Sequence, residues 1–183
     1  MGNIRIIGGK WRSRLITCAG APGLRPTPAR IRETLFNWLQ YDVAGSRCLD
    51  LYAGSGALGF EAASRGARKV VQVENNAAAL TALIDNKSHL AADGVNIVKN
   101  NVNTFLRGEP EAFDLIFLDP PFANDLISET CMLLEQRGWL SETAKIYIES
   151  ERQLQLTGLS NNWHRLQRKQ AGEVCYQLFT RIV

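Results

Sequence analysis

The sequence predicts an α/β protein whose sheet is mostly parallel and covered by helices on both faces. From residue 47 onward, short apolar segments bounded by turns alternate with helical segments, and this alternation is typical of a parallel sheet with crossover helices. The 183 residues are enough for one such domain with a buried core. With 45% hydrophobic and 21% charged residues, the composition indicates a globular protein and excludes a disordered chain.

The elements of this sheet can be placed in order along the chain. Strands are expected at 48–51, 70–73, 95–98, 113–118 and 145–148. Helices are expected at 56–65, 77–86 and 126–137, and Gly66 is the expected stop of the first. The segments 163–166 and 174–182, joined across Ala171-Gly172, are expected to close the sheet as an antiparallel hairpin.

Residues 1–40 are predicted to form an extension to a main domain at 41–183. Apolar pairs at Ile6-Ile7 and Leu15-Ile16 predict a β-hairpin. Thr27 before Pro28 predicts the start of a helix, with Thr27 as its N-cap. Helical spacing predicts an inward face made of Ile31, Leu35, Trp38 and Leu39.

The cysteines give no sign of a metal site or a disulfide framework. They stand at 18, 48, 131 and 175, without paired spacing, and the two histidines form no cluster with them. No apolar run is long enough to span a bilayer, and the N-terminus lacks the apolar core of a signal peptide. We therefore expect a reduced, cytoplasmic, monomeric protein without a metal.

A glycine-rich loop predicts a cofactor site. The run from Gly54 to Gly59 fits G-x-G-x-x-G, directly after an expected strand and at the start of an expected helix. Glycines allow the tight turn and the close approach of a ligand to the backbone. Glu74 ends the next strand, where an acid commonly holds ribose hydroxyls. Taken alone, this pattern suits a nicotinamide dinucleotide equally well.

Asp50, just before the loop, favours S-adenosylmethionine. A carboxylate can bind the amino group of a methionine moiety, whereas it would repel a pyrophosphate. Asn101 stands where an aspartate near the adenine amino group is common, and its amide oxygen can accept the same hydrogen bond. The expected cofactor-binding residues are Asp50, Tyr52, Ala53, Gly54, Ser55, Gly56, Glu74, Asn75, Asn101 and Val102.

A second motif predicts methylation of an amino group on a nucleic-acid base. Asp119-Pro120-Pro121-Phe122 follows an apolar strand, so it should face the same crevice as the glycine loop. The Asp119 carboxylate and the Pro120 carbonyl can each accept one N–H, which orients a nitrogen whose lone pair is delocalised into the ring. Pro120 and Pro121 stiffen the loop, and Phe122 can stack on the base. These four residues are the expected catalytic set.

Together these segments resemble the RsmD family of bacterial 16S ribosomal RNA guanine-N2 methyltransferases. The resemblance covers nearly the whole chain, and its most specific parts are the runs at 8–14 and 24–38. It implies a Rossmann-like class I methyltransferase fold, with Asp50, Gly54, Gly56 and Glu74 at the cofactor and Asp119, Pro120 and Phe122 at the guanine. It also implies methyl transfer to the N2 amino group of a specific guanine, in the small ribosomal subunit or a late assembly particle.

The N-terminal extension is predicted to bind RNA. Its basic residues are accompanied by only one acid, Glu33, before Asp42, while the net charge of the chain is +3. The expected RNA-binding residues are Arg5, Lys10, Trp11, Arg12, Arg14, Arg25, Thr27, Arg30 and Arg32.

Three other functions compete with this interpretation. An adenine-N6 methyltransferase would use the same Asp119 motif, although no additional target-recognition domain is evident in a chain of this length. A non-catalytic RNA-binding assembly factor would need neither Asp119 nor the intact glycine loop. A nicotinamide-dependent reductase would leave Asp119 to Phe122 without a role.

Overall fold

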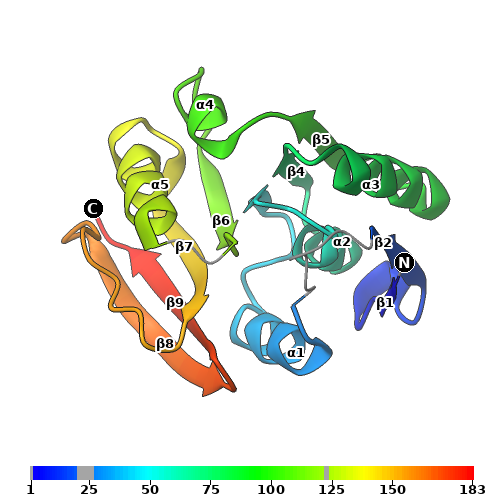
Figure 1. Cartoon of the computed structure of the whole chain (residues 1–183), viewed down its shortest axis with the longest axis horizontal. Helices are drawn as coiled ribbons and strands as arrows, with labels where there is room; N and C mark the ends of the chain where they lie inside the picture. The colour runs from blue at the N-terminus through cyan, green and yellow to red at the C-terminus, as the bar shows by residue number, and fades with distance from the viewer. Residues whose placement is uncertain (1, 20–26, 122–123) are drawn as a thin grey trace.

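The computed structural model describes residues 2–19, 27–121 and 124–183 (Figure 1). Its main body is a seven-stranded sheet in the order β5-β4-β3-β6-β7-β9-β8. The parallel strands are β3 (Arg47–Leu51), β4 (Lys69–Glu74), β5 (Val95–Lys99), β6 (Phe113–Leu118) and β7 (Leu140–Glu151). The antiparallel hairpin is β8 (Trp163–Ala171) with β9 (Val174–Arg181), and β9 pairs with β7. The predicted sheet and closing hairpin are therefore confirmed.

Helices cover both faces of the sheet because successive strand residues point in opposite directions. Leu49 and Ile148 pack on one face with residues of α4 (Val102–Leu106) and α5 (Asn124–Gln136). Cys48 and Tyr147 point to the opposite layer, which contains α1 (Ala29–Trp38), α2 (Ala57–Ser64) and α3 (Ala77–Leu90). Burial on both faces explains why the central strands are continuously apolar in sequence.

The N-terminal extension packs on the end of α2. It consists of β1 (Gly2–Arg5) paired with β2 (Leu15–Cys18), joined through the short 3-10 helix η1 (Gly9–Trp11). Gly9 has φ +75, and a Cβ there would lie 1.9 Å from the carbonyl oxygen of Ser64. Trp11 and Ile16 belong to the same hydrophobic cluster as residues of α1 and α2. The extension thus shares its core with the main body, and a functional boundary after residue 40 stays a prediction.

Several local details differ from the sequence-based expectations. Thr27 is not an N-cap: the cap position of α1 is Pro28, and no side chain caps that end. Helix α4 was not expected; the Asn101 side chain caps it by accepting from two backbone amides. Strand β7 is longer than predicted, and α3 continues to Leu90. In the described part of the chain, no helix has the length and apolar character needed to cross a membrane.

Candidate active site

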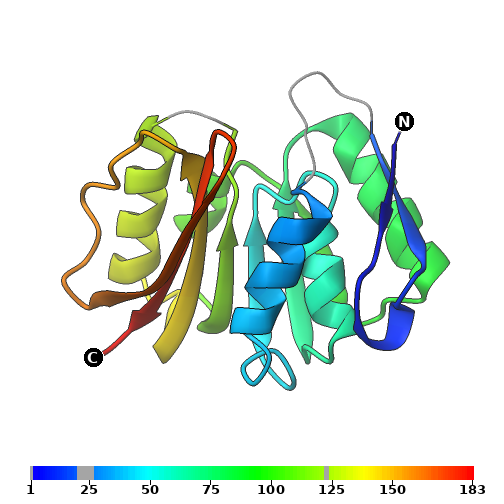
Figure 2. The same ribbon diagram turned by 90° about the horizontal axis from the view of Figure 1, so that it is seen from below.

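All parallel strands end at the same edge of the sheet, at the top of Figure 2. Four acids stand at these strand ends: Asp50, Glu74, Asp119 and Glu149. Phe117 and Tyr147 both point to the face of the sheet that α1 covers. Because side chains alternate along a strand, Asp119 and Glu149, each two residues further on, point to that same face. Since Leu118 pairs with Ile148, Asp119 and Glu149 occupy adjacent positions at a strand spacing of about 4.8 Å. The topology therefore gathers carboxyl groups at the predicted crevice.

The glycine loop needs glycine for steric reasons. Gly54 and Gly56 have φ values of 54 and 75, in the left-handed region that disfavours other residues. A Cβ at Gly56 would lie 2.5 Å from Leu83 Cδ2 and 2.8 Å from Phe60 Cε2. Gly56 is also the N-cap of α2 and offers no capping side chain. Two of the first amides of α2 are satisfied by side chains of the loop and of β3, since Ala57 donates to Ser55 Oγ at 3.3 Å and Gly59 to Asp50 Oδ2 at 3.0 Å.

Tyr52 stores backbone strain beside the loop. Its φ of 61 is in the left-handed region although it is not glycine, a conformation that costs about 1–2 kcal/mol. Its hydroxyl lies 2.8 Å from the hydroxyl of Thr130 on α5, which fixes the ring. Ala53 and Ser55 are buried next to it. Strain of this kind is typical of ligand-binding loops.

Asp50 holds the turn from inside. Its Oδ2 accepts from the Gly59 amide at 3.0 Å and from Gln72 Nε2 at 3.1 Å, and burial raises the pKa of Asp50 to about 7. The sequence did not indicate Gln72 as a partner. A cationic amino group nearby would favour the ionised form of this carboxyl, so direct contact between Asp50 and a methionine moiety stays a prediction.

Glu74 ties the glycine loop to the start of α3. Its Oε2 accepts from the Gly54 amide at 2.7 Å, and its Oε1 accepts from the amides of Asn75 and Asn76 at 2.8 Å. Asn75 is exposed at the same edge. Carboxylate oxygens have several acceptor sites, so the predicted contact of Glu74 with ribose hydroxyls is compatible with these bonds.

Asn101 has a second task besides the predicted adenine contact. Its Oδ1 accepts from the amides of Asn103 and Thr104 at 2.9 and 3.4 Å. Any adenine amino group would have to share this oxygen with the helix cap. Val102, also expected at the cofactor, is buried in the first turn of α4.

Asp119 is held from the N-terminal side of α1. The Thr27 hydroxyl donates to Asp119 Oδ2 at 3.1 Å. Burial raises the pKa of Asp119 to about 6, and the Thr27 bond opposes that rise. Pro120 is buried and Pro121 is exposed, while the predicted stacking residue Phe122 lies outside the described residues. Thr27, expected at RNA, is buried and serves Asp119.

Glu149 is a member of this site that the sequence analysis missed. Only 5% of the residue is exposed, and its Oε1 accepts from the Tyr147 hydroxyl at 2.8 Å. Burial raises the pKa of Glu149 to about 8, and the charge of Asp119 acts in the same direction. The sequence held a signal, because Glu149 directly follows the strand predicted at 145–148, as Asp119 follows its own strand.

Besides Thr27, two other residues expected at RNA are buried. Trp11 lies in the core, with 5% of its surface exposed. Arg32 is 2% exposed and bonds to the carbonyls of Thr27 and Arg5 and to the Glu61 carboxylate. The expectation of an RNA-facing surface was wrong for this pair, because charge spacing along the chain does not show that an acid 29 residues away neutralises Arg32.

The remaining cations of that set keep their side chains in solvent. The exposed members are Arg5, Lys10, Arg12, Arg14 and Arg30. Arg14 is partly engaged, since its Nη2 donates to the His89 carbonyl at 2.7 Å. Arg25 lies outside the described residues. RNA binding by these exposed residues stays a prediction.

Comparisons with known proteins agree on one group of relatives. A family model described as Conserved hypothetical protein 95 matches residues 4–180. The chain is 45% identical to Ribosomal RNA small subunit methyltransferase D of Escherichia coli (strain K12), covering 98% of this chain and 91% of the relative. The corresponding Haemophilus influenzae protein is 40% identical, with 97% and 94% covered.

Solved structures extend the comparison to the fold. The putative methyltransferase yhhF from Escherichia coli superposes with a TM-score of 0.91 at 44% identity, covering 99% of both chains. A putative SAM-dependent methyltransferase from Streptococcus mutans, at 17% identity, superposes with a TM-score of 0.67 and covers 86% of this chain and 50% of its own. At that identity the second likeness concerns the fold alone, and it is the predicted Rossmann-like methyltransferase fold.

Proposed function

We propose that this chain, which belongs to the Conserved hypothetical protein 95 or RsmD family, methylates small-subunit ribosomal RNA with S-adenosylmethionine as methyl donor. The acceptor is the exocyclic N2 amino group of guanine 966 in 16S rRNA, within the small subunit or a late assembly particle. The observation that carries the proposal is Asp119, placed by β6 at the carboxyl edge of the sheet, next to the strand that leads into the glycine loop.

The residues of this edge fit S-adenosylmethionine chemically. The cofactor has a positive sulfonium and a positive amino group, and it supplies an activated methyl group when bound. Burial raises the pKa values of Asp50 and Asp119, and neighbouring positive charge would stabilise their ionised forms. Gly54 and Gly56 leave backbone space for close approach, and Glu74 stands at the end of the adjacent strand. A negatively charged pyrophosphate would find these acids unfavourable.

Asp119 performs two tasks in the proposed reaction. Its carboxylate and the Pro120 carbonyl each accept one N–H of the guanine amino group, which aligns the nitrogen for methyl transfer. The nitrogen becomes acidic when it gains the methyl group, and the Asp119 carboxylate can accept the proton that it releases. Phe122 is proposed to stack on the base.

We propose that the RNA contacts two surfaces of the protein. The turn that contains Lys10 and Arg12 rests on the C-terminal end of α2, roughly 12 Å from the glycine loop at 1.5 Å per helical residue. Figure 2 shows this turn at the opposite end from the carboxyl edge. The exposed cations of the turn can therefore anchor flanking RNA, but not the target nucleotide itself.

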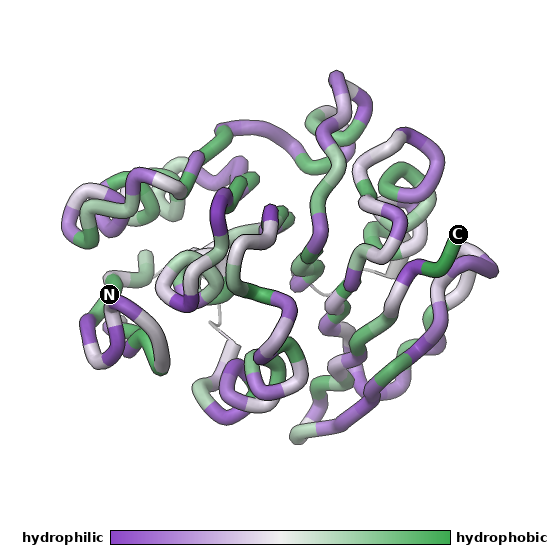
Figure 3. Tube along the Cα trace, turned by 180° about the vertical axis from the view of Figure 1, so that it is seen from behind, coloured by the Kyte–Doolittle hydropathy of each residue, from purple (hydrophilic) through white to green (hydrophobic). Residues whose placement is uncertain are grey.

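Strand β8 offers positive charge closer to the site. Its positions 164–170 are all exposed, and Arg165, Arg168 and Lys169 are unaccompanied by any acid between Trp163 and Ala171. Figure 3 shows this outer strand as largely hydrophilic. Lys169 pairs with Tyr176, which pairs with Glu149, so Lys169 is level with Glu149 at about 10 Å. We propose that phosphates beside the target guanine contact β8.

Transfer of labelled methyl groups tests this function. The purified chain is incubated with labelled S-adenosylmethionine and, separately, with naked 16S rRNA, small subunits and DNA, followed by nucleoside analysis. We expect N2-methylguanosine in the ribosomal substrates. N6-methyladenosine in DNA would support the adenine alternative, and no labelled nucleoside in any substrate would contradict the proposal.

Gly56→Ala is expected to weaken S-adenosylmethionine binding by at least about tenfold, because the new Cβ would displace Leu83 and Phe60 under the loop. Gly45→Ala is the matched control: Gly45 has φ +79, but no atom lies within 4 Å of its Cβ position. Isothermal titration with the cofactor measures both affinities. Equal affinities would show that the loop tolerates the side chain.

A further inference from the structure

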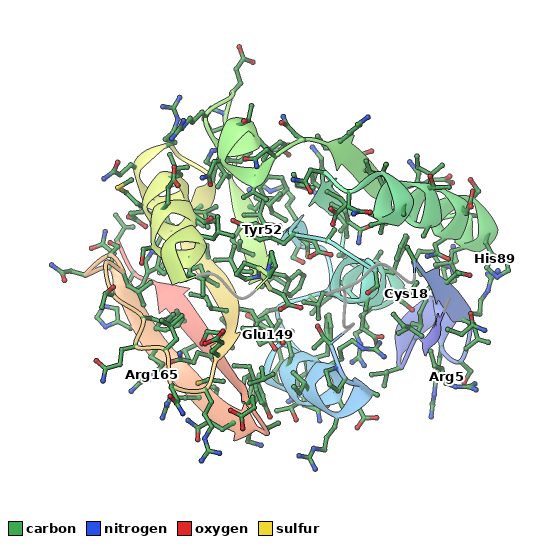
Figure 4. The ribbon with its side chains drawn as sticks, viewed as in Figure 1. Arg5, Cys18, Tyr52, His89, Glu149 and Arg165 are labelled. Carbon is green, nitrogen blue, oxygen red and sulfur yellow. The ribbon has the colours of Figure 1, made fainter. Side chains whose placement is uncertain are left out.

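Three separate parts of the chain meet around the Asp119 carboxylate. Thr27 precedes α1, Asp119 follows β6, and Glu149 is near the end of β7. Figure 4 shows Glu149 on the side of the sheet that faces α1. The Thr27 hydroxyl donates to Asp119 Oδ2 at 3.1 Å, and Glu149 occupies the adjacent strand position, because Leu118 pairs with Ile148. The hydroxyl that binds Asp119 therefore stands at a site where two carboxyl groups are neighbours.

The number of available protons restricts the charge of this cluster. A threonine hydroxyl has a single proton, and its hydrogen bond to the Asp119 carboxylate uses that proton. The Tyr147 hydroxyl already donates to Glu149 Oε1. If Glu149 is neutral, its own proton can be donated to the Thr27 oxygen, and every group then has a partner. If it is ionised, two adjacent buried anions compete for the one Thr27 proton.

We propose that Glu149 is a positioning residue that acts on Asp119 through Thr27. Neutral Glu149 donates to Thr27 Oγ1, and the Thr27 proton is thereby directed to Asp119 Oδ2. Asp119 stays ionised, with one oxygen fixed and the other available to the guanine amino group. This inference rests on the proposed amino-group chemistry at Asp119.

The folded structure needs only an acceptor for the Tyr147 hydroxyl at this position, and a neutral side chain could supply it without a carboxyl group. A buried acid beside a second acid is costly, and an apolar residue of similar volume would be favoured for stability. The ionisable groups that face Glu149 are Asp119 from β6, Tyr147 from its own strand and Tyr176 from β9. Among the described residues, neither acid forms an ion pair with lysine or arginine. Such an arrangement is typical of functional sites.

The direction of the pH dependence follows from the cluster. Burial and the charge of Asp119 raise the pKa of Glu149 to about 8, so Glu149 keeps its proton at neutral pH and loses it as the pH rises through that value. Above that pH the Thr27 proton is shared between two anions, and Asp119 is no longer held in one orientation. We therefore expect kcat to fall on the alkaline side.

Variants of Glu149 separate positioning from other roles. In Glu149→Gln the side-chain amide can still donate to Thr27, so kcat at pH 7 should stay within about threefold of wild type, and the alkaline fall should disappear. In Glu149→Leu the donor is lost, and kcat should fall by about tenfold or more, while KM for RNA and the cofactor Kd change by less than about twofold. Glu151→Gln removes an exposed charge from the same strand and is the control.

Thr27 gives a second series at the same cluster. Thr27→Ser keeps the hydroxyl and should retain the wild-type pH profile, whereas Thr27→Val should lower kcat as Glu149→Leu does. The two losses should not add in the double variant, because both break the same chain of hydrogen bonds. Circular dichroism and cofactor titration check that each variant is folded.

Isotope-edited infrared spectroscopy measures whether the Glu149 carboxyl group is protonated, and it does so without methyl transfer taking place. We expect the C=O band of a protonated carboxyl at pH 7, its loss above pH 8, and its absence from Glu149→Gln. Lack of that band, equal inactivity of Glu149→Gln and Glu149→Leu, or an alkaline fall that persists in Glu149→Gln would each overturn the inference. A wild-type protein with the band but without methyl transfer would contradict the proposed function instead.

Discussion

Asp119→Ala is expected to lower the rate of methyl transfer by about 10²- to 10³-fold while the Kd for S-adenosylmethionine changes by less than about threefold. In the proposed reaction the carboxylate orients the amino nitrogen and takes up its proton, and without it only the Pro120 carbonyl would remain to accept an N–H of that amino group. Single-turnover kinetics with saturating cofactor measures the first quantity, and isothermal titration measures the second.

Asp114→Ala is the control for this experiment. Asp114 is on the same strand, at the end remote from the site, where it accepts from the Arg47 amide at 2.8 Å. Loss of the Asp114 carboxylate should leave the transfer rate within about twofold of wild type, because Asp114 is remote from the groups proposed to stabilise the transition state. If Asp119→Ala lost cofactor affinity and turnover to the same degree, Asp119 would be part of the fold of the site rather than of its chemistry.

Glu61→Ala is expected to lower the free energy of unfolding by about 3–5 kcal/mol, the usual cost of removing one partner of a buried ion pair. The Glu61 carboxylate is fully buried and accepts from the amides of Ile7 and Gly8 at 2.9 and 2.8 Å. It also pairs with Arg65 at 2.8 Å and with Arg32 at 3.4 Å. Removing it leaves the Arg32 charge buried without its acid and removes the two hydrogen bonds from Ile7 and Gly8 that help to hold the N-terminal hairpin on α2. Urea denaturation measures the loss.

The Lys69–Glu111 pair provides the comparison for Glu61. Both side chains of that pair are more than one-third accessible, and exposed ion pairs contribute about 0–1 kcal/mol. Glu111→Ala should therefore change the free energy of unfolding by less than about 1 kcal/mol. An effect of Glu61→Ala no larger than this would show that the network around Arg32 adds nothing to stability.

Features that depend on residues close together in the sequence could be predicted from the sequence alone. The alternation of apolar strands and helices predicted the parallel sheet, because a strand buried on both faces must be apolar throughout. The Gly54–Gly59 run and the Asp119 motif were expected to lie at one edge of the sheet, and they do, because carboxyl ends of parallel strands share one edge. The family could be predicted from the runs at 8–14 and 24–38, which are the parts of the sequence most specific to that family.

Only the tertiary structure decided how distant residues meet. Thr27 reads as a helix cap in sequence, yet its hydroxyl bonds to Asp119, 92 residues away, because the start of α1 faces the end of β6. Arg32 reads as an RNA contact, yet Glu61 neutralises it inside the protein. Glu149 becomes part of the site because Leu118 and Ile148 are in register, and register between strands is set by packing of the whole sheet. Local motifs were thus sufficient to predict a site for methylation of an amino group. The charge and orientation of the Asp119 carboxylate, in contrast, depend on contacts between residues that are distant in the sequence and meet only in the folded protein.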